Sequence, residues 1–241
     1  MAFRLLNRTV VLPTLGFGLG VATFMKAWPD EAGAITLNKG KQNTVETQVL
    51  PRSDVIQKIT ESRLYQQLRQ DQNMQQSRQS DKIPAGHKPY HVGQGILFGK
   101  DKLEIDPLIF LNETEGKLTV FYHLGKDLGN EKGEVHKGII SLLMDEALCY
   151  CGFPRLPSKR GVTAKLSLKF NRDIPADSTV ILTASVRESK GRKCIIDGNL
   201  QVYNEQHVLP GLWGEKEPHV QAECILVEPK WFKYFRRLNM F

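Results

Sequence analysis

The segment at residues 135–150, VHKGIISLLMDEALCY, constrains the fold most, because it predicts a helix that is apolar around nearly its whole circumference. It lacks the polar stripe of a surface helix, so other elements must enclose it on most sides. Two acids, Asp145 and Glu146, lie within it. Burial disfavours a charged carboxylate unless the carboxylate finds hydrogen-bond donors or a solvent pocket. Both acids are therefore candidates for a functional site.

Helix geometry separates these two acids. Asp145 lies seven residues after Gly138, so it returns to nearly the same face as the start of the helix, whereas Glu146 is turned by about 100°. Asp145 is therefore the better candidate. The alternative, equally weighted from the helix alone, is that both acids lie at the helix edge and are capped by backbone or paired with a lysine.

The rest of the sequence around the helix predicts antiparallel strands. Residues 162–170 alternate strictly, with Val162 and Leu166 on the apolar face and Thr163 and Lys165 on the polar face. Further strands are predicted at residues 108–112, 117–124, 179–187, 193–203 and 220–227. One long buried helix among such strands indicates an α+β fold, in which an antiparallel sheet wraps around the helix.

Taken together, VHKGIISLLMDEAL and GVTAKLSLKFNRDIPADSTVILTASV resemble the hotdog-fold acyl-CoA thioesterases. The likeness is to the phenylacetyl-CoA thioesterase-like branch, and especially to its fungal mitochondrial members, over roughly residues 90–228. In that family an Asp nine residues after a His is the nucleophile or general base, and Asp145 has this spacing from His136. A hydroxyl residue on the next strand orients the attacking water, which implies that role for Thr163. Asn130, six residues before the His, matches a polar site residue of some relatives.

One residue departs from the family pattern. The family reads His-Gly-Gly where this chain reads His136, Lys137 and Gly138. The resemblance implies that the backbone N–H of Lys137 holds the thioester carbonyl oxygen, and a lysine at a helix N-terminus still offers that N–H. The change puts rate and substrate in doubt more than fold. His136 has the alternative role of bonding backbone at the start of the helix, which we favour over proton transfer.

The spacing within the helix predicts a dimer. Lys137 and Asp145 are eight residues apart, so their backbones lie roughly 12 Å apart on one helix. One carbonyl cannot sit about 3 Å from both groups. Two antiparallel helices across a two-fold axis would bring them together, and the resemblance implies the same homodimer, alone or as a dimer of dimers.

The net charge of +7 raises the question of nucleic-acid binding, but no zinc spacing, ribonucleoprotein motif or phosphate loop supports it. We expect no nucleic-acid partner, no metal and no cofactor beyond the coenzyme A of the substrate. Gly138 is a predicted substrate-binding residue, and Lys159 and Arg160 are predicted to meet coenzyme A phosphates. The alternative for these basic residues is a solvated surface.

Four regions are predicted along the chain. Residues 1–29 carry basic residues, no acid and an apolar run, which suits a mitochondrial targeting segment, a short membrane anchor, or both. Residues 30–89 form a polar linker with one amphipathic helix, residues 90–228 the thioesterase-like domain, and residues 229–241 a basic aromatic tail. A secreted location is the competing interpretation, but the four cysteines show no disulfide framework.

The sequence therefore predicts a mitochondrial, membrane-associated acyl-CoA thioesterase. The alternative is a non-catalytic hotdog module that binds acyl chains or serves membrane-linked assembly, with Lys137 as its main support. A hotdog hydratase is less favoured, since its usual Asp-His pair on the helix is absent from this sequence.

Overall fold

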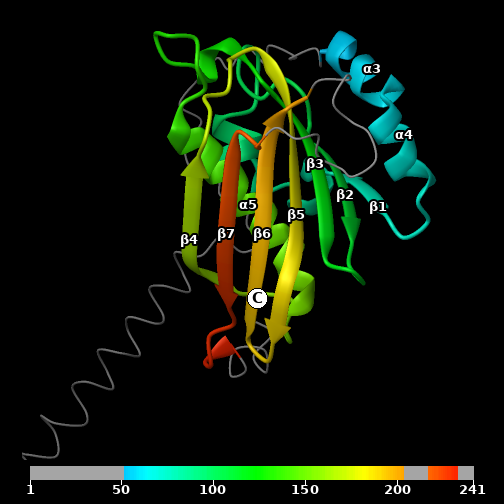
Figure 1. Ribbon diagram of the computed structural model, residues 1–241, viewed down its shortest axis with the longest axis vertical. Helices are drawn as coiled ribbons and strands as arrows, with labels where there is room; N and C mark the ends of the chain where they lie inside the picture. The colour runs from blue at the N-terminus through cyan, green and yellow to red at the C-terminus, as the bar shows by residue number, and fades with distance from the viewer. Residues whose placement is uncertain (1–51, 204–216, 233–241) are drawn as a thin grey trace, which may run out of the picture. The chain divides into compact units, whose positions relative to one another are not determined.

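The computed structural model describes residues 52–203 and 217–232 (Figure 1). The predicted targeting segment, the first part of the linker and most of the C-terminal tail lie outside these residues. Within the described ranges, no helix is both long enough and apolar enough to cross a membrane.

The fold is built on one antiparallel sheet of seven strands in the order β1-β2-β3-β5-β6-β7-β4. The strands are β1 (Gln75–Arg78), β2 (Leu108–Asn112), β3 (Lys117–Leu124), β4 (Val162–Phe170), β5 (Ser178–Lys190), β6 (Lys193–Val202) and β7 (Val220–Val227). The six predicted strands are confirmed. Strand β1 was not predicted, because its Gln-rich sequence carries no strand signal and it forms only by pairing with β2.

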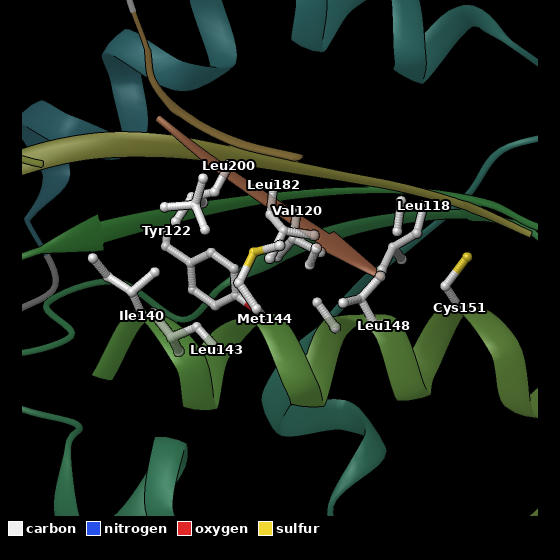
Figure 2. Packing of buried hydrophobic residues seen from close by; sticks show 14 of the residues in the cluster. Leu118, Val120, Tyr122, Ile140, Leu143, Met144, Leu148, Cys151, Leu182 and Leu200 are labelled. Carbon is white, nitrogen blue, oxygen red and sulfur yellow. The ribbon is translucent and has the colours of Figure 1, made fainter. Parts of the chain in front are cut away.

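The predicted central helix is also confirmed, as α5 (Lys137–Gly152), and it lies behind the sheet in Figure 1. Side chains from the helix and from β3, β5 and β6 interdigitate in the main core, as Figure 2 shows for Met144, Tyr122 and Leu200. Gly198 of β6 allows the close approach, because a Cβ there would lie 2.8 Å from the Leu148 side chain. The sheet and α5 therefore form the α+β arrangement expected from the sequence.

A second, smaller core lies on the opposite face of the sheet. The predicted amphipathic helix is in fact two helices, α3 (Ser53–Glu61) and α4 (Arg63–Gln70). They are separated by Ser62, whose extended backbone breaks the helix and whose hydroxyl accepts the Tyr65 N–H at 3.2 Å. Val55, Ile59 and Tyr65 from this pair pack on residues of β2, β3 and β5. One half of the sheet is therefore covered on both faces.

Short helical segments complete the described chain. They are η2 (Gln79–Lys82), η3 (Lys88–Tyr90), η4 (Val92–Ile96), η5 (Lys126–Leu128) and η6 (Phe153–Arg155). Gln79 of η2 and His91, which precedes η4, reach the side chain of Glu146 on α5. This early part of the chain therefore forms one wall of the space beside the central helix.

Candidate active site

Asp145 of α5 and Thr163 of β4 are in direct contact. The Thr163 hydroxyl donates to Asp145 Oδ1 at 2.9 Å, and both side chains are half-buried. Within the described part of the chain no group donates to Asp145 Oδ2, so this oxygen remains able to accept a proton. The structure thus joins the two residues that the resemblance singled out.

A β-bulge explains how Thr163 comes to face the helix. Strand β4 pairs with β7, and its register shifts between Thr163 and Lys165, so Ala164 is an extra residue. Thr163 lies opposite Leu226, whose side chain is fully buried, and it therefore shares the core face. The predicted strict alternation, with Thr163 on the polar face and Val162 on the core face, was wrong at this end: Val162 is 47 % exposed. Because of the bulge, Thr163 points to the core face and Val162 to the opposite face, which is the reverse of what alternation along the rest of the strand predicts.

A cavity of about 320 Å³ opens beside Asp145. It lies between α5 and strands β2 and β3, and the segment around η2 and His91 forms its remaining wall. Apolar side chains make most of the lining, and Asp145 and Glu146 are its two carboxylates. Mostly apolar cavities with a few polar groups are the usual form of small-molecule sites.

Glu146 lines this cavity together with Asp145, although the 100° turn between neighbouring positions favoured Asp145 alone. Its carboxylate accepts a hydrogen bond from Gln79 Nε2 at 3.0 Å, and His91 Nε2 lies 3.7 Å away. Burial raises the pKa of Glu146, while His91 and Gln79 oppose this rise. Helix geometry could not identify this residue, since the partners come from a segment distant in sequence.

Cys149 is another residue that the sequence argument did not select. It lies one turn after Asp145, and its Sγ is 3.2 Å from the Thr163 hydroxyl oxygen. Interactions with the Cys224 thiol and then with Thr163 lower the pKa of the Cys149 thiol against the opposing effect of burial. Asp145, Thr163 and Cys149 thus form one chain of polar contacts from helix to strand.

His136 takes the capping role that we favoured from the sequence. It is the N-cap of α5, and its Nδ1 accepts the Gly138 N–H at 3.0 Å. Gly138 permits this, because a Cβ there would lie 3.0 Å from the same nitrogen. Lys137 is the first helical residue, and its N–H is one of the N-terminal groups that no helical carbonyl can satisfy. The Lys137 ammonium lies 3.4 Å from Asp173 and near the ring of Phe170.

The structure does not bring the other predicted residues to Asp145 within one chain. The Asn130 side chain accepts the backbone N–H groups of Lys132 and Glu134 and so holds the turn before α5. Lys159 has a positive φ of 54° in the loop before β4, and its ammonium lies 3.7 Å from Glu113. Arg160 follows in the same exposed loop. Their predicted contacts with substrate stay predictions.

A separate cluster has the composition of a metal site. Side chains of Glu104, His123 and Asp177 place one potential ligand atom each within 4.8 Å of one another. However, Arg52 Nη1 lies 3.0 Å from Glu104 and 3.5 Å from Asp177, so a guanidinium already compensates these carboxylates. The cluster ties the start of α3 to the sheet.

The fold and the site define a hotdog protein with an acid at the middle of its central helix. Residues 132–209 match the family model described as "Thioesterase superfamily". The chain is also 52 % identical to MIOREX complex component 3 of Saccharomyces cerevisiae, over 99 % of this chain and 97 % of that protein. This chain belongs to the thioesterase superfamily and has its hotdog fold.

Two further relatives differ in what they are called. An uncharacterized mitochondrial protein of Candida albicans is 44 % identical, over 99 % of this chain and all of that protein. Acyl-coenzyme A thioesterase THEM4 of Rattus norvegicus is 24 % identical, over 54 % of this chain and 50 % of its own length. The names of these three relatives refer, in turn, to a complex, to a mitochondrial location and to an acyl-CoA thioesterase activity.

Proposed function

We propose that this protein is an acyl-CoA thioesterase, which hydrolyses an acyl-CoA to the free acid and coenzyme A. The observation that carries the proposal is the hydrogen bond from Thr163 to Asp145 at the edge of a mostly apolar cavity. A carboxylate held by one donor keeps a free oxygen for proton transfer, and the cavity offers space for an acyl group.

In the proposed reaction Asp145 acts as general base or as nucleophile. As a base it takes a proton from a water that Thr163 helps to hold, and the water oxygen bonds to the thioester carbonyl carbon. The carbon–sulfur bond then breaks, Asp145 returns the proton to the sulfur, and coenzyme A leaves as the thiol. The N–H of Lys137 and the positive end of the α5 dipole, both from a second copy of the chain, stabilise the oxyanion.

The site that we propose is shared between two subunits. Lys137 and Asp145 lie on the same continuous helix, eight residues apart, so one copy cannot hold a carbonyl between them. One side of α5 is also incompletely covered in the described part of the chain: Ser141, Leu142 and Asp145 are only half-buried, although α5 is the central helix. Strand β4 is an edge strand, which offers backbone groups for pairing with a second copy.

The activity is tested with the purified full-length chain and a panel of acyl-CoA substrates from acetyl to palmitoyl. Release of free coenzyme A thiol is expected for at least one, and Asp145→Asn should lower kcat by about 10²- to 10⁴-fold. Thr163→Val should be impaired, whereas Thr163→Ser keeps the hydroxyl and most of the activity. Thr60→Val is the matched control, because the Thr60 hydroxyl bonds the carbonyl of Gln57 within α3, away from the site.

Unchanged turnover in Asp145→Asn would refute the mechanism. No turnover by the wild-type chain on the whole panel would favour a second candidate function, a non-catalytic hotdog module in a mitochondrial assembly. The name of the Saccharomyces cerevisiae relative and the lysine at position 137 support that candidate.

We also propose a mitochondrial location, supported by the composition of residues 1–29 and by the name of the Candida albicans relative. Association with the membrane through this segment is the finer proposal, and retention of the full chain in the pellet after carbonate extraction of mitochondria would support it.

For the assembly candidate, the Asp145→Asn chain should restore any function that deletion of the protein removes, because no catalysis would be required.

A further inference from the structure

The cavity beside Asp145 holds a second carboxylate that the proposed hydrolysis does not use. Glu146 follows Asp145 directly on α5, and its side chain is 24 % exposed. Placing a carboxylate in a mostly apolar cavity carries a desolvation cost, and burial accordingly raises its pKa.

Several polar side chains hold Glu146 in a defined position. Gln79 Nε2 donates to Glu146 Oε2 at 3.0 Å. The amide of Gln79 is itself oriented by Gln94, which donates to Gln79 Oε1 at 2.9 Å and to Asp106 at 3.0 Å. Because the side-chain oxygen of Gln79 accepts the hydrogen bond from Gln94, the Gln79 NH2 group points toward Glu146. One carboxylate oxygen is therefore satisfied by a fixed neutral donor.

The other oxygen, Oε1, retains capacity to accept. His91 Nδ1 accepts the Gln94 N–H at 3.2 Å, so the ring N–H lies on Nε2, which faces Glu146. That Nε2 is 3.7 Å from Oε1, which is longer than a hydrogen bond. Among the described residues, no lysine or arginine pairs with Glu146.

Most of the other lining residues are apolar, although Lys82 also lines the cavity, with its ammonium 5.9 Å from the centre of the Tyr150 ring. Ile109, Leu118, Val120, Ala147 and Phe153 line the cavity of about 320 Å³. A purely hydrocarbon ligand would cover Glu146 Oε1 without giving it a partner, and an unsatisfied buried acceptor is costly. A ligand with one donor in the right place would remove that cost.

We propose that this cavity binds an acyl group that is mostly hydrocarbon and carries a hydrogen-bond donor, a hydroxyl or an ammonium, which binds Glu146 Oε1. The inference rests on the proposed thioesterase function and names its substrate class. Glu146 is then a specificity-determining residue, and Gln79 and His91 are positioning residues. Asp145 performs the chemistry on the same substrate.

The test compares coenzyme A thioesters of straight-chain acids from butyryl to decanoyl with counterparts that end in a hydroxyl or an ammonium. For the best donor-bearing substrate, wild-type kcat/KM should exceed that of its plain analogue by about 10- to 100-fold, as expected for a hydrogen bond to a charged group. Glu146→Met removes the acceptor at similar volume, so this ratio should fall to one or below while plain substrates are still hydrolysed. Glu188→Gln, at an exposed position of β5, should leave the ratio unchanged.

Glu146→Gln separates the two kinds of donor and is nearly isosteric. Its amide oxygen must accept from Gln79, so an NH2 group takes the place of Oε1. A hydroxyl can accept from this group, so a preference for a hydroxyl should largely survive, whereas an ammonium can only donate and its preference should be lost. A wild-type ratio near one for every chain length overturns the proposal irrespective of how the variants fold.

If the wild-type chain hydrolyses no thioester, the proposed function fails and binding decides this inference by itself. Calorimetry of the Asp145→Asn chain with the same thioesters should then show tighter binding of a donor-bearing compound than of its plain analogue. Equal affinities, or no binding of either compound, would overturn it.

Discussion

Lys137 is the residue at which this chain departs most visibly from its family, and the structure makes its role testable. It is the first residue of α5, where a proline is well tolerated and where the N–H has no helical partner. His136 before it has an extended backbone, with φ −61° and ψ 128°, which is the conformation that a following proline prefers. Replacing Lys137 by proline therefore removes the N–H without breaking the helix.

We expect Lys137→Pro to abolish thioester hydrolysis, whereas Lys137→Gly and Lys137→Ala keep it or raise it, because both retain the proposed oxyanion donor. The measurement is kcat with each purified full-length variant, and circular dichroism confirms the fold. Equal activity in the proline and glycine variants would eliminate the oxyanion role. A raised KM for coenzyme A thioesters in both the glycine and the alanine variants would instead assign the ammonium to substrate binding.

At the scale of elements, the contact between α5 and β6 fixes the position of the central helix. A Cβ on Gly198 would lie 2.8 Å from Leu148 and 3.3 Å from Met144, both of which are fully buried. Gly198→Val should therefore overpack this contact and lower the free energy of unfolding by about 1–3 kcal/mol, measured by urea denaturation. Asn199→Val is the control on the other face of the same strand, and its loss should be smaller. A stable Gly198→Val chain would show that the helix can move away from the sheet.

At the scale of the whole molecule, the proposed site requires two copies. The full-length chain should be a dimer, or a dimer of dimers, by light scattering. Mixing inactive Asp145→Asn chains with inactive Lys137→Pro chains should restore activity, because a heterodimer contains one composite site with both groups intact. With random mixing, about a quarter of the wild-type activity is expected, since half of the dimers are mixed and each has one working site. A monomer that remains fully active would contradict the shared site.

Local patterns were sufficient for most of the fold. The apolar run of the helix and the alternation of period 2 predicted the helix and the six strands around it, and the motifs at residues 135–148 and 161–186 carried the family likeness. The sequence at the start of the helix also predicted that His136 bonds backbone, which the structure confirms. These features are local because hydrophobic spacing and capping act over a few residues.

Features that depend on pairing between distant segments were decided by the tertiary structure alone. The Gln-rich sequence of β1 becomes a strand because β2 offers it an edge, and Ser62 divides a helix that periodicity left continuous. Thr163 turns toward Asp145 because the ladder with β7 accommodates Ala164 as a bulge, which alternation within β4 cannot reveal. Glu146 joins the cavity because Gln79 and His91, far earlier in the chain, fold against α5. The sequence by itself determined the central helix and the acid on it that we propose as catalytic, because both depend on neighbouring residues, while long-range contacts decided what surrounds that acid.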